Sequence, residues 1–498
     1  MMKFINYTAF IIFILYSFQT HAQRGKDGNK VVSANTVINE YTYLTSDAVA
    51  GSSTINVNSN NLNSNNRFNG PLSAGDLIMI IQLQGATVKS SVKDNTWGEI
   101  LNYNNAGLYE FAQVFGVQGS NGIILDCPLK NNFTVTAHTQ IVRVPRYMSL
   151  TVNGGVLSGD SWNGTVGGIL AIEVLNSTIV NNGASMNMSG KGFRGGKAAD
   201  KLNAYGVDDY YWATGEYGAE KGEGIAGYET DYDTNLGGRF CRGAPANGGG
   251  GGNAHDHGGG GGANAGTISL WTGKGNPDTS NTNWKLAWNL ESPGFATSSS
   301  SGGGRGGYSF SNSDQNALTL GPVNDAWGGD RRNNNGGLGG RPLDYSSGRI
   351  YMGGGGGAGE QSDGVGSAGA NGGGIIFIQS YGPINGDGQI ISNGADAGPT
   401  TGDGIDGAGG GGGGGTIIVQ STGNIAGITL TANGGKGGNQ VVYSATQAEG
   451  PGGGGGGGYI AISNGSVIRN TNGGANGTTN SPQMTEFPPN GATKGGAG

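Results

Sequence analysis

The most metal-like pattern in the sequence is His255-Asp256-His257, which lies between two runs of glycine. Two imidazoles and a carboxylate suit Zn²⁺ or another transition metal. A complete site needs further ligands from elsewhere in the chain, and neighbouring histidines are also common in loops that bind no metal. His255, Asp256 and His257 are therefore the candidate metal ligands, and a structural loop is the alternative.

Asp403 and Asp406, within GDGIDGAGG, are similar to the glycine-aspartate turns that bind Ca²⁺ in β-rolls. The nine-residue spacing of such turns does not recur in this chain. We expect no cofactor, and bound Ca²⁺ or Zn²⁺ at these two places stays open as an alternative.

Acidic and aromatic residues alternate in DDYYWATGEYGAEKGEGIAGYETDYD, residues 208–233. Paired carboxylates between aromatic platforms would suit glycoside cleavage. Spacing alone does not bring two carboxylates to a catalytic separation, so we expect a solvated, aromatic-rich surface loop and name no catalytic residue. The chain also lacks a Walker-type Gly-Lys-Ser/Thr motif and a G-x-S-x-G elbow.

Tryptophan is concentrated between residues 197 and 372, which hold five of the seven in the chain. Tryptophan on a loop-rich surface commonly mediates recognition. Some of these side chains must belong to a local core instead. The candidate ligand-binding residues are Trp212, Trp271, Trp284, Trp288 and Trp327.

Two kinds of β-structure are expected to position these residues. Residues 35–146 contain short β-branched runs, such as AGDLIMIIQLQG and HTQIVRVPR, separated by Gly and Asn turns. This pattern predicts an N-terminal β-sandwich or barrel.

A repeat follows. GGILAIEV from Gly167, GGIIFIQS from Gly373, GGTIIVQS from Gly414 and GGYIAISN from Gly457 each precede a second short strand. The last three begin 41 and 43 residues apart, a period typical of stacked repeats. We expect a β-solenoid with two strands in each unit, and hairpins in a sandwich are the alternative.

Five glycine runs are expected to lie along this solenoid. Because seven residues of an extended polyproline-II-like helix span roughly 22 Å, about the length of a six-residue strand, each run matches a strand in length. We expect polyglycine-II rods whose backbones bond to one another, and flexible loops are the alternative. The runs are residues 248–252, 258–262, 353–357, 409–415 and 452–458.

Composition excludes several classes of protein. The net charge is −7 and no basic stripe is present, so a nucleic-acid partner is not expected.

Residues 1–22 read as a signal peptide, which makes Gln23 the new N-terminus, and no later stretch is apolar enough to span a membrane. Cys127 and Cys241 form either one bridge or two free thiols.

These features divide the chain in sequence order. The expected parts are a signal peptide (1–22), an N-terminal β-domain (23–147), a first solenoid unit (148–196), a Gly/Trp-rich insertion (197–372), solenoid repeats (373–478) and a tail (479–498).

The strings AGDLIMIIQLQGA, YNNAGLYEFAQV, GGLGGRPLDYSSGR and TEFPPNGATKGG resemble a family of large secreted Bacteroidetes-type cell-surface proteins. The glycine runs resemble the polyglycine-II bundles of phage tail-fibre adhesins. The family resemblance implies a cell-surface location. Members often continue into adhesion repeats and a type IX sorting domain; this sequence stops at TKGGAG with neither, so either it is a fragment or it leaves by another route.

The expected function is that of a secreted adhesin or extracellular structural protein that binds glycans or matrix proteins through multivalent contacts. One alternative is a polysaccharide lyase or hydrolase of the β-helix type. Such an enzyme needs clustered charged residues on one solenoid face, whereas the repeat strands carry few beyond Glu173 and Arg469. The other alternative is a passive structural spacer.

Overall fold

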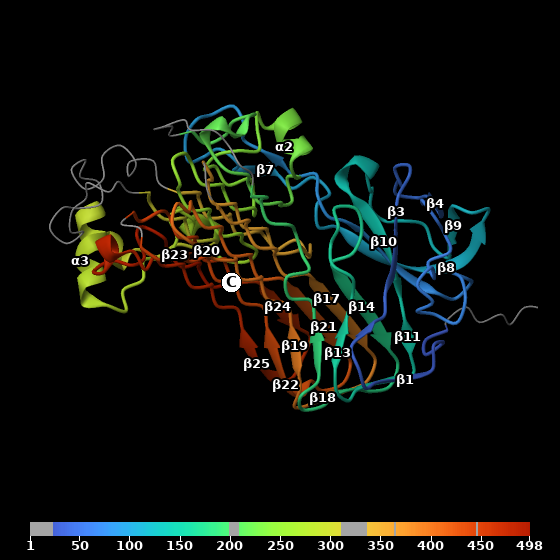
Figure 1. Cartoon of the computed structure of the whole chain (residues 1–498). Helices are drawn as coiled ribbons and strands as arrows, with labels where there is room; N and C mark the ends of the chain where they lie inside the picture. Colours follow the sequence, from blue (N-terminus) through green and yellow to red (C-terminus); the bar gives the residue numbers. More distant parts are fainter. Residues whose placement is uncertain (1–22, 199–208, 310–335, 363–364, 445–446) are drawn as a thin grey trace, which may run out of the picture.

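The computed structural model describes residues 23–198, 209–309, 336–362, 365–444 and 447–498 (Figure 1). The expected signal peptide and Trp327 lie outside the described residues. The expectation of a nearly all-β chain is confirmed, because the longest helix among the described residues, α3 (Thr282–Glu291), has only ten residues. Within these ranges, no helix is long and apolar enough to cross a membrane.

An antiparallel sheet of six strands forms one part of the molecule, on the right of Figure 1. A bridge between Leu44 and Val57 brings its two edge strands together, so the sheet curls around its own buried core. Ile78 and Ile80 of its central strand point into that core, whereas Met79 and Ile81 join the core shared with the parallel sheets. In spatial order the strands are β3 (Glu40–Tyr43), β10 (Thr139–Val144), β5 (Leu77–Gln82), β8 (Tyr109–Gln118), β9 (Gly122–Leu125) and β4 (Thr54–Asn56).

Three parallel sheets form the second part, with strands stacked side by side in the lower half of Figure 1. The first sheet contains β11 (Arg146–Tyr147), β14 (Ile169–Val174), β17 (Ile375–Ser380), β21 (Thr416–Ser421) and β24 (Tyr459–Ile462). The second contains β2 (Thr36–Val37), β13 (Val156–Ser158), β16 (Ser185–Asn187), β19 (Gln389–Ile391), β22 (Ala426–Thr431) and β25 (Ser466–Asn470). The third contains β1 (Asn29–Val32), β12 (Ser149–Val152), β15 (Thr178–Val180) and β18 (Ile384–Gly386).

The four strands that follow Gly-Gly in the repeat lie next to one another and in register. Ile169, Ile375, Thr416 and Tyr459 pair in succession across the first sheet. Every second residue of these strands points inward, and the three sheets share one apolar core. The outer face of the first sheet is also largely covered, which explains why its strands read as continuous apolar runs.

Two features of the parallel sheets differ from the expectation. Each of the first two repeat units contains a third short strand, β15 or β18, where a turn was expected between two strands. These strands, TIV and ING, are too short to show an alternating pattern. In addition, β1 and β2 pair with β12 and β13, so residues 23–147 supply strands to both the antiparallel and the parallel sheets.

The five glycine runs pack against one another and form what we call the glycine layer. The amide of Gly260 donates to the Gly250 carbonyl, that of Gly357 to Gly260, and that of Gly410 to Gly357, at 2.8, 2.8 and 2.9 Å. All residues of the five runs are buried, and none has a left-handed φ. Glycine is therefore required here for close approach between backbones.

We expect slow hydrogen exchange throughout the glycine layer, because its buried amides donate hydrogen bonds to neighbouring glycine runs or to other segments packed against them. Exchange should be at least about a hundredfold slower than in the exposed turn at Gly119–Asn121 of the same molecule. Mass spectrometry of proteolytic fragments after exchange measures both regions together. Equal rates in the two regions would instead support the flexible-loop alternative.

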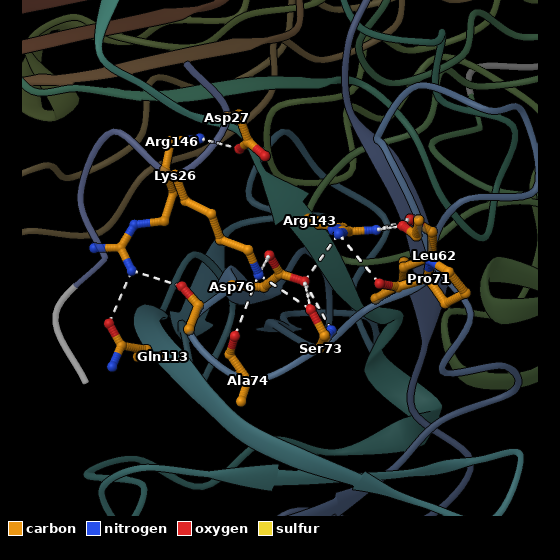
Figure 2. Close-up of polar contacts among 12 residues, drawn as sticks. Lys26, Asp27, Leu62, Pro71, Ser73, Ala74, Asp76, Gln113, Arg143 and Arg146 are labelled. Atoms are coloured by element: carbon orange, nitrogen blue, oxygen red, sulfur yellow. Dashed lines mark hydrogen bonds and ion pairs between the residues drawn. The ribbon is translucent and has the colours of Figure 1, made fainter. Parts of the chain in front are cut away.

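A buried ionic network joins the antiparallel and parallel sheets (Figure 2). Asp76 accepts hydrogen bonds from Lys26 Nζ at 2.7 Å and from Arg143 Nη2 at 2.8 Å. Arg146, at the start of the parallel stack, donates to Gln113 of β8 at 2.8 Å, and its backbone N–H donates to Asp27. These bonds fix the antiparallel sheet against the parallel sheets.

The two cysteines are free thiols, which decides between the two alternatives left open by the sequence. Cys127 is exposed. Cys241 is buried within the glycine-rich insertion, and its burial raises the pKa of the thiol to about 12. No covalent bridge therefore contributes to the stability of this fold.

Candidate functional site

A hollow of about 320 Å³ lies beside Trp271, and we call it the Trp271 hollow. It forms where the loop before β7 (Ile100–Asn102) meets two segments of the insertion, one at Trp271 and the other at Arg341. Its lining residues are Asn95, Thr96, Glu99, Ile100, Tyr103, Ile268, Trp271, Arg341 and Pro342.

The indole of Trp271 is held in one orientation. Its Nε1–H donates to the carbonyls of Gly339 and Gly340 at 3.0 and 3.1 Å. The guanidinium carbon of Arg341 lies 3.5 Å from the ring centroid, a cation–π contact. Arg341 donates in turn to the carbonyl of Trp97 at 3.0 Å. The ring is therefore fixed before any ligand arrives.

A second aromatic side chain of the hollow, Tyr103, is also positioned by hydrogen bonding. Its hydroxyl oxygen accepts from the backbone N–H of Asp344 at 2.9 Å. Burial raises the pKa of this phenol, so the hydroxyl keeps its proton near neutral pH and can still donate.

Polar groups at the rim complete the hollow. The side chains of Glu99 and Asn95 are exposed, and Glu99 contributes a carboxylate that accepts hydrogen bonds. An indole that carries the Arg341 guanidinium on one face of its ring, beside a carboxylate and an amide, suits a ligand with an apolar patch and peripheral hydroxyl groups.

A larger hollow of about 760 Å³ lies next to the first one and shares Ile268 with it. Tyr345 and Tyr459 stack on its wall with ring centroids 3.8 Å apart. Tyr459 begins β24, so this second hollow lies at the last strand of the first parallel sheet.

Among the described residues, the candidate tryptophans other than Trp271 do not line this hollow. Trp212 is half-buried and packs edge-on against Tyr217, with centroids 4.8 Å apart. Trp284 and Trp288 lie on α3, and Trp288 is fully buried against Phe487. The assignment of Trp288 to a ligand site is therefore wrong, because its ring is core.

Asp256 and His257 are buried beside the glycine layer, and His255 is partly buried. His257 is fully buried and its Nδ1 pairs with the Asn253 carbonyl at 3.1 Å, while His255 pairs with Asp256. The described ranges contain no group of three or more His, Cys, Asp or Glu arranged to hold a metal ion. Zn²⁺ binding at this segment stays a prediction.

Asp403 connects two successive repeat units. Its carboxylate accepts from the backbone N–H groups of Tyr443 and Ser444 at 3.0 and 2.8 Å. Asp406 is buried. The bonds of Asp403 have a structural role without an ion, and Ca²⁺ binding stays a prediction.

The acidic stretch at residues 208–233 is not a solvated loop in its central part, because residues 218–225 are buried. The carboxylate of Glu223 accepts from Arg194 Nε at 2.8 Å and from Trp162 Nε1 at 3.0 Å. The amide of Gly222 also donates to Gly249, which ties this stretch to the glycine layer. The expectation of a solvated loop was wrong for this part. The glycines of the stretch, such as Gly222, were the sequence signal that it could pack against the glycine layer.

Glu99, Tyr103 and Arg341 were not identified from the sequence. Glu99 and Tyr103 belong to the N-terminal segment, and only the fold brings them to Trp271. No local pattern distinguishes them from other surface residues.

Comparisons with known proteins place few limits on this site. No protein-family model matches the chain, and no curated relative matches it. The resemblance to secreted Bacteroidetes-type proteins therefore stays a prediction.

Two solved structures with partial similarity are phage tailspikes. One is the tailspike of Acinetobacter baumannii bacteriophage AP22 in complex with capsular saccharide, with 12% identity over 32% of this chain and 33% of the tailspike, at a TM-score of 0.16. The other is a tailspike of Pseudomonas phage LKA1, with 14% identity over 33% of each chain, at a TM-score of 0.13. This chain thus spans about a third of each tailspike, and scores this low establish no shared fold.

Proposed function

We propose that this protein is a secreted or surface-exposed glycan-binding protein whose Trp271 hollow receives a sugar ring. The observation that carries the proposal is the fixed indole of Trp271 beside the exposed carboxylate of Glu99, in a hollow of about 320 Å³. Sugars present an apolar C–H face and hydroxyl groups at the ring edge. The indole complements the first, and Glu99 and Asn95 complement the second.

Preorganisation of the hollow supports this proposal. Binding costs less free energy when the binding groups are already ordered. Trp271 is bonded to Gly339 and Gly340, and the amide of Gly340 donates to Gly261 of the glycine layer at 2.9 Å. The indole therefore rests on backbone that has little freedom to move.

We infer further that the parallel sheets form a short β-solenoid and that the glycine layer is a polyglycine-II bundle. The register of the repeat strands and the bonds between glycine runs support these two inferences. A rigid scaffold of this kind suits multivalent adhesion, because it holds binding sites at fixed separations. The secretion signal expected in residues 1–22 supports an extracellular setting.

The test uses the chain from Gln23 against immobilised polysaccharides and matrix proteins, with retention and release of new chain ends measured in the same wells. We expect retention on at least one glycan without release. Trp271→Ala should weaken retention at least tenfold, because it removes the aromatic face. Trp284→Ala is the matched control, since Trp284 is also half-buried but does not line the hollow.

Three results would contradict the proposal in different ways. Release of chain ends would favour the lyase or hydrolase alternative. Retention that survives Trp271→Ala would move the binding site elsewhere on the molecule. No retention on any surface would favour a passive spacer.

A further inference from the structure

Arg341, in the wall of the Trp271 hollow, is a buried cation that lacks a neighbouring carboxylate among the described residues. It is 9% exposed. Three other buried arginines each bond to a carboxylate: Arg143 to Asp76, Arg146 to Glu173 and Arg305 to Glu291, at 2.8, 2.5 and 2.6 Å. The acid that acts on the charge of Arg341, from a greater distance, is Glu99. Because a buried charge is costly unless it is paired, an anion in the hollow would stabilise this guanidinium.

The hydrogen bonds of Arg341 leave one amino group for a ligand. Nη2 donates to the carbonyls of Asn95 and Trp97 at 2.8 and 3.0 Å. Nε bonds to no described residue and is fully buried, so a ligand cannot reach it. Nη1 also bonds to no described residue, but it is not fully buried. Since the side chain lines the hollow, Nη1 is the donor that a ligand would meet there.

The guanidinium is held in place before a ligand binds. Its carbon lies 3.5 Å from the ring centroid of Trp271, and the backbone N–H of Arg341 donates to the Ala246 carbonyl at 2.8 Å. Burial lowers the pKa of Arg341 to about 10, so the group still carries its charge at neutral pH. The hollow therefore presents a positive group at a fixed position in its wall.

We propose that the Trp271 hollow selects acidic sugars, and that Nη1 of Arg341 donates to the carboxylate of a hexuronic acid residue. This inference rests on the proposed function, because the same hollow receives the sugar ring. The carboxylate would supply the counter-charge that Arg341 lacks among the described residues. Hydrogen bonds between two charged groups are roughly twice as strong as those between neutral groups. A neutral hydroxyl at the same place would leave the buried charge unpaired.

The charges around the hollow make this selection local. The net charge of the chain is −7, so the molecule as a whole does not attract acidic polymers. Glu99 is exposed at the rim, where water and salt screen its repulsion of an anion. Arg341 is buried, where charges interact more strongly. Binding of an acidic sugar therefore depends on direct contact between its carboxylate and Arg341.

The experiment compares acidic glycans with their neutral esters, using the chain from Gln23. Polygalacturonate, alginate and hyaluronan, the methyl ester of each, and the neutral glycans dextran and xylan are immobilised, and the Kd of the protein for each is measured. Methylation removes the charge of the carboxylate and keeps the sugar ring. We expect at least one acidic glycan to bind about tenfold or more tightly than its own ester, as the loss of a hydrogen bond between charged groups implies.

Arg341→Met tests whether this residue causes the preference. The ratio of the two Kd values, ester to acid, should fall to about one, because the charge that distinguishes the two ligands is gone. Arg341 also supports Trp271, but a loosened hollow would weaken both ligands equally and keep the ratio. Arg349→Met is the matched control, because Arg349 lies 5.9 Å from the Tyr103 ring without lining the hollow. It should keep the wild-type ratio.

The comparison of acid and ester needs only the wild-type protein, so it remains decisive if Arg341→Met does not fold. Equal binding of each acid and its ester, or binding to the neutral glycans alone, would overturn the inference and leave the glycan site in place. A preference for the acid that survives Arg341→Met would overturn the role of Arg341. Absence of binding to every glycan, acidic or neutral, would instead contradict the proposed function itself.

Discussion

Gly357→Ala is expected to lower the free energy of unfolding by more than about 3 kcal/mol, beyond the usual cost of an overpacked core. The added Cβ would lie 1.9 Å from the carbonyl oxygen of Gly250 and 2.4 Å from its carbonyl carbon. Real Cβ atoms do not approach backbone so closely, so a whole glycine run must move.

The position of Gly357 explains why such movement is costly. Its N–H donates to Gly260 and its carbonyl accepts from Gly410, while its Cα faces Gly250. The residue therefore contacts three other runs of the glycine layer at once. Displacing one run breaks bonds to the other two, and buried peptide groups without partners each cost about 1–3 kcal/mol.

Chemical denaturation of the variant and the wild type measures this difference. Gly398→Ala is the matched control, because its Cβ would meet no atom within 4 Å and the residue is exposed with no left-handed φ. The control should stay within about 0.5 kcal/mol of the wild type, as surface substitutions usually do. If Gly357→Ala were as stable as Gly398→Ala, the runs would not be packed.

The glycine layer was predictable from the sequence for two reasons. The extended length of a glycine run matches the length of a strand, and only glycine allows extended backbones to approach one another on all sides. The repeat strands were predictable for a similar reason, since four Gly-Gly strings of equal pattern specify one register. The short strands β15 and β18 were not, because their side chains show no periodic pattern.

The candidate site was only partly predictable. Trp271 was identified as one of five tryptophans, and nothing in the sequence separates it from Trp288, which is core. The difference depends on tertiary contacts. Trp288 packs against Phe487, whereas Trp271 lines the same hollow as Glu99 from the N-terminal segment. Packing between segments so far apart in the sequence cannot be recognised from the residues that surround each tryptophan.

Asp76→Asn is expected to destabilise the protein by about 3 kcal/mol, because it leaves the buried guanidinium of Arg143 without its hydrogen-bonded counter-charge. Both side chains are about 4% exposed, so water cannot replace the lost carboxylate. Arg143 also donates to the carbonyls of Leu62 and Gly70, which hold it in place when the charge is removed (Figure 2 shows Leu62). The arginine cannot turn towards solvent to recover hydration.

Thermal and chemical unfolding measure the effect, with Asp126→Asn as the control, since exposed Asp126 bonds to a side chain of the same antiparallel sheet. Replacing both Asp76 and Arg143 distinguishes two costs. One is the cost of an unpaired buried charge, and the other is the cost of losing the hydrogen bonds and packing of the Arg143 side chain. Asp76→Asn with Arg143→Met should be more stable than Asp76→Asn alone, because the second change removes the unpaired buried charge. If the double variant is less stable than the single one, the bonds of Arg143 to backbone carbonyls dominate, and the network holds the two β-structures together through those bonds more than through charge.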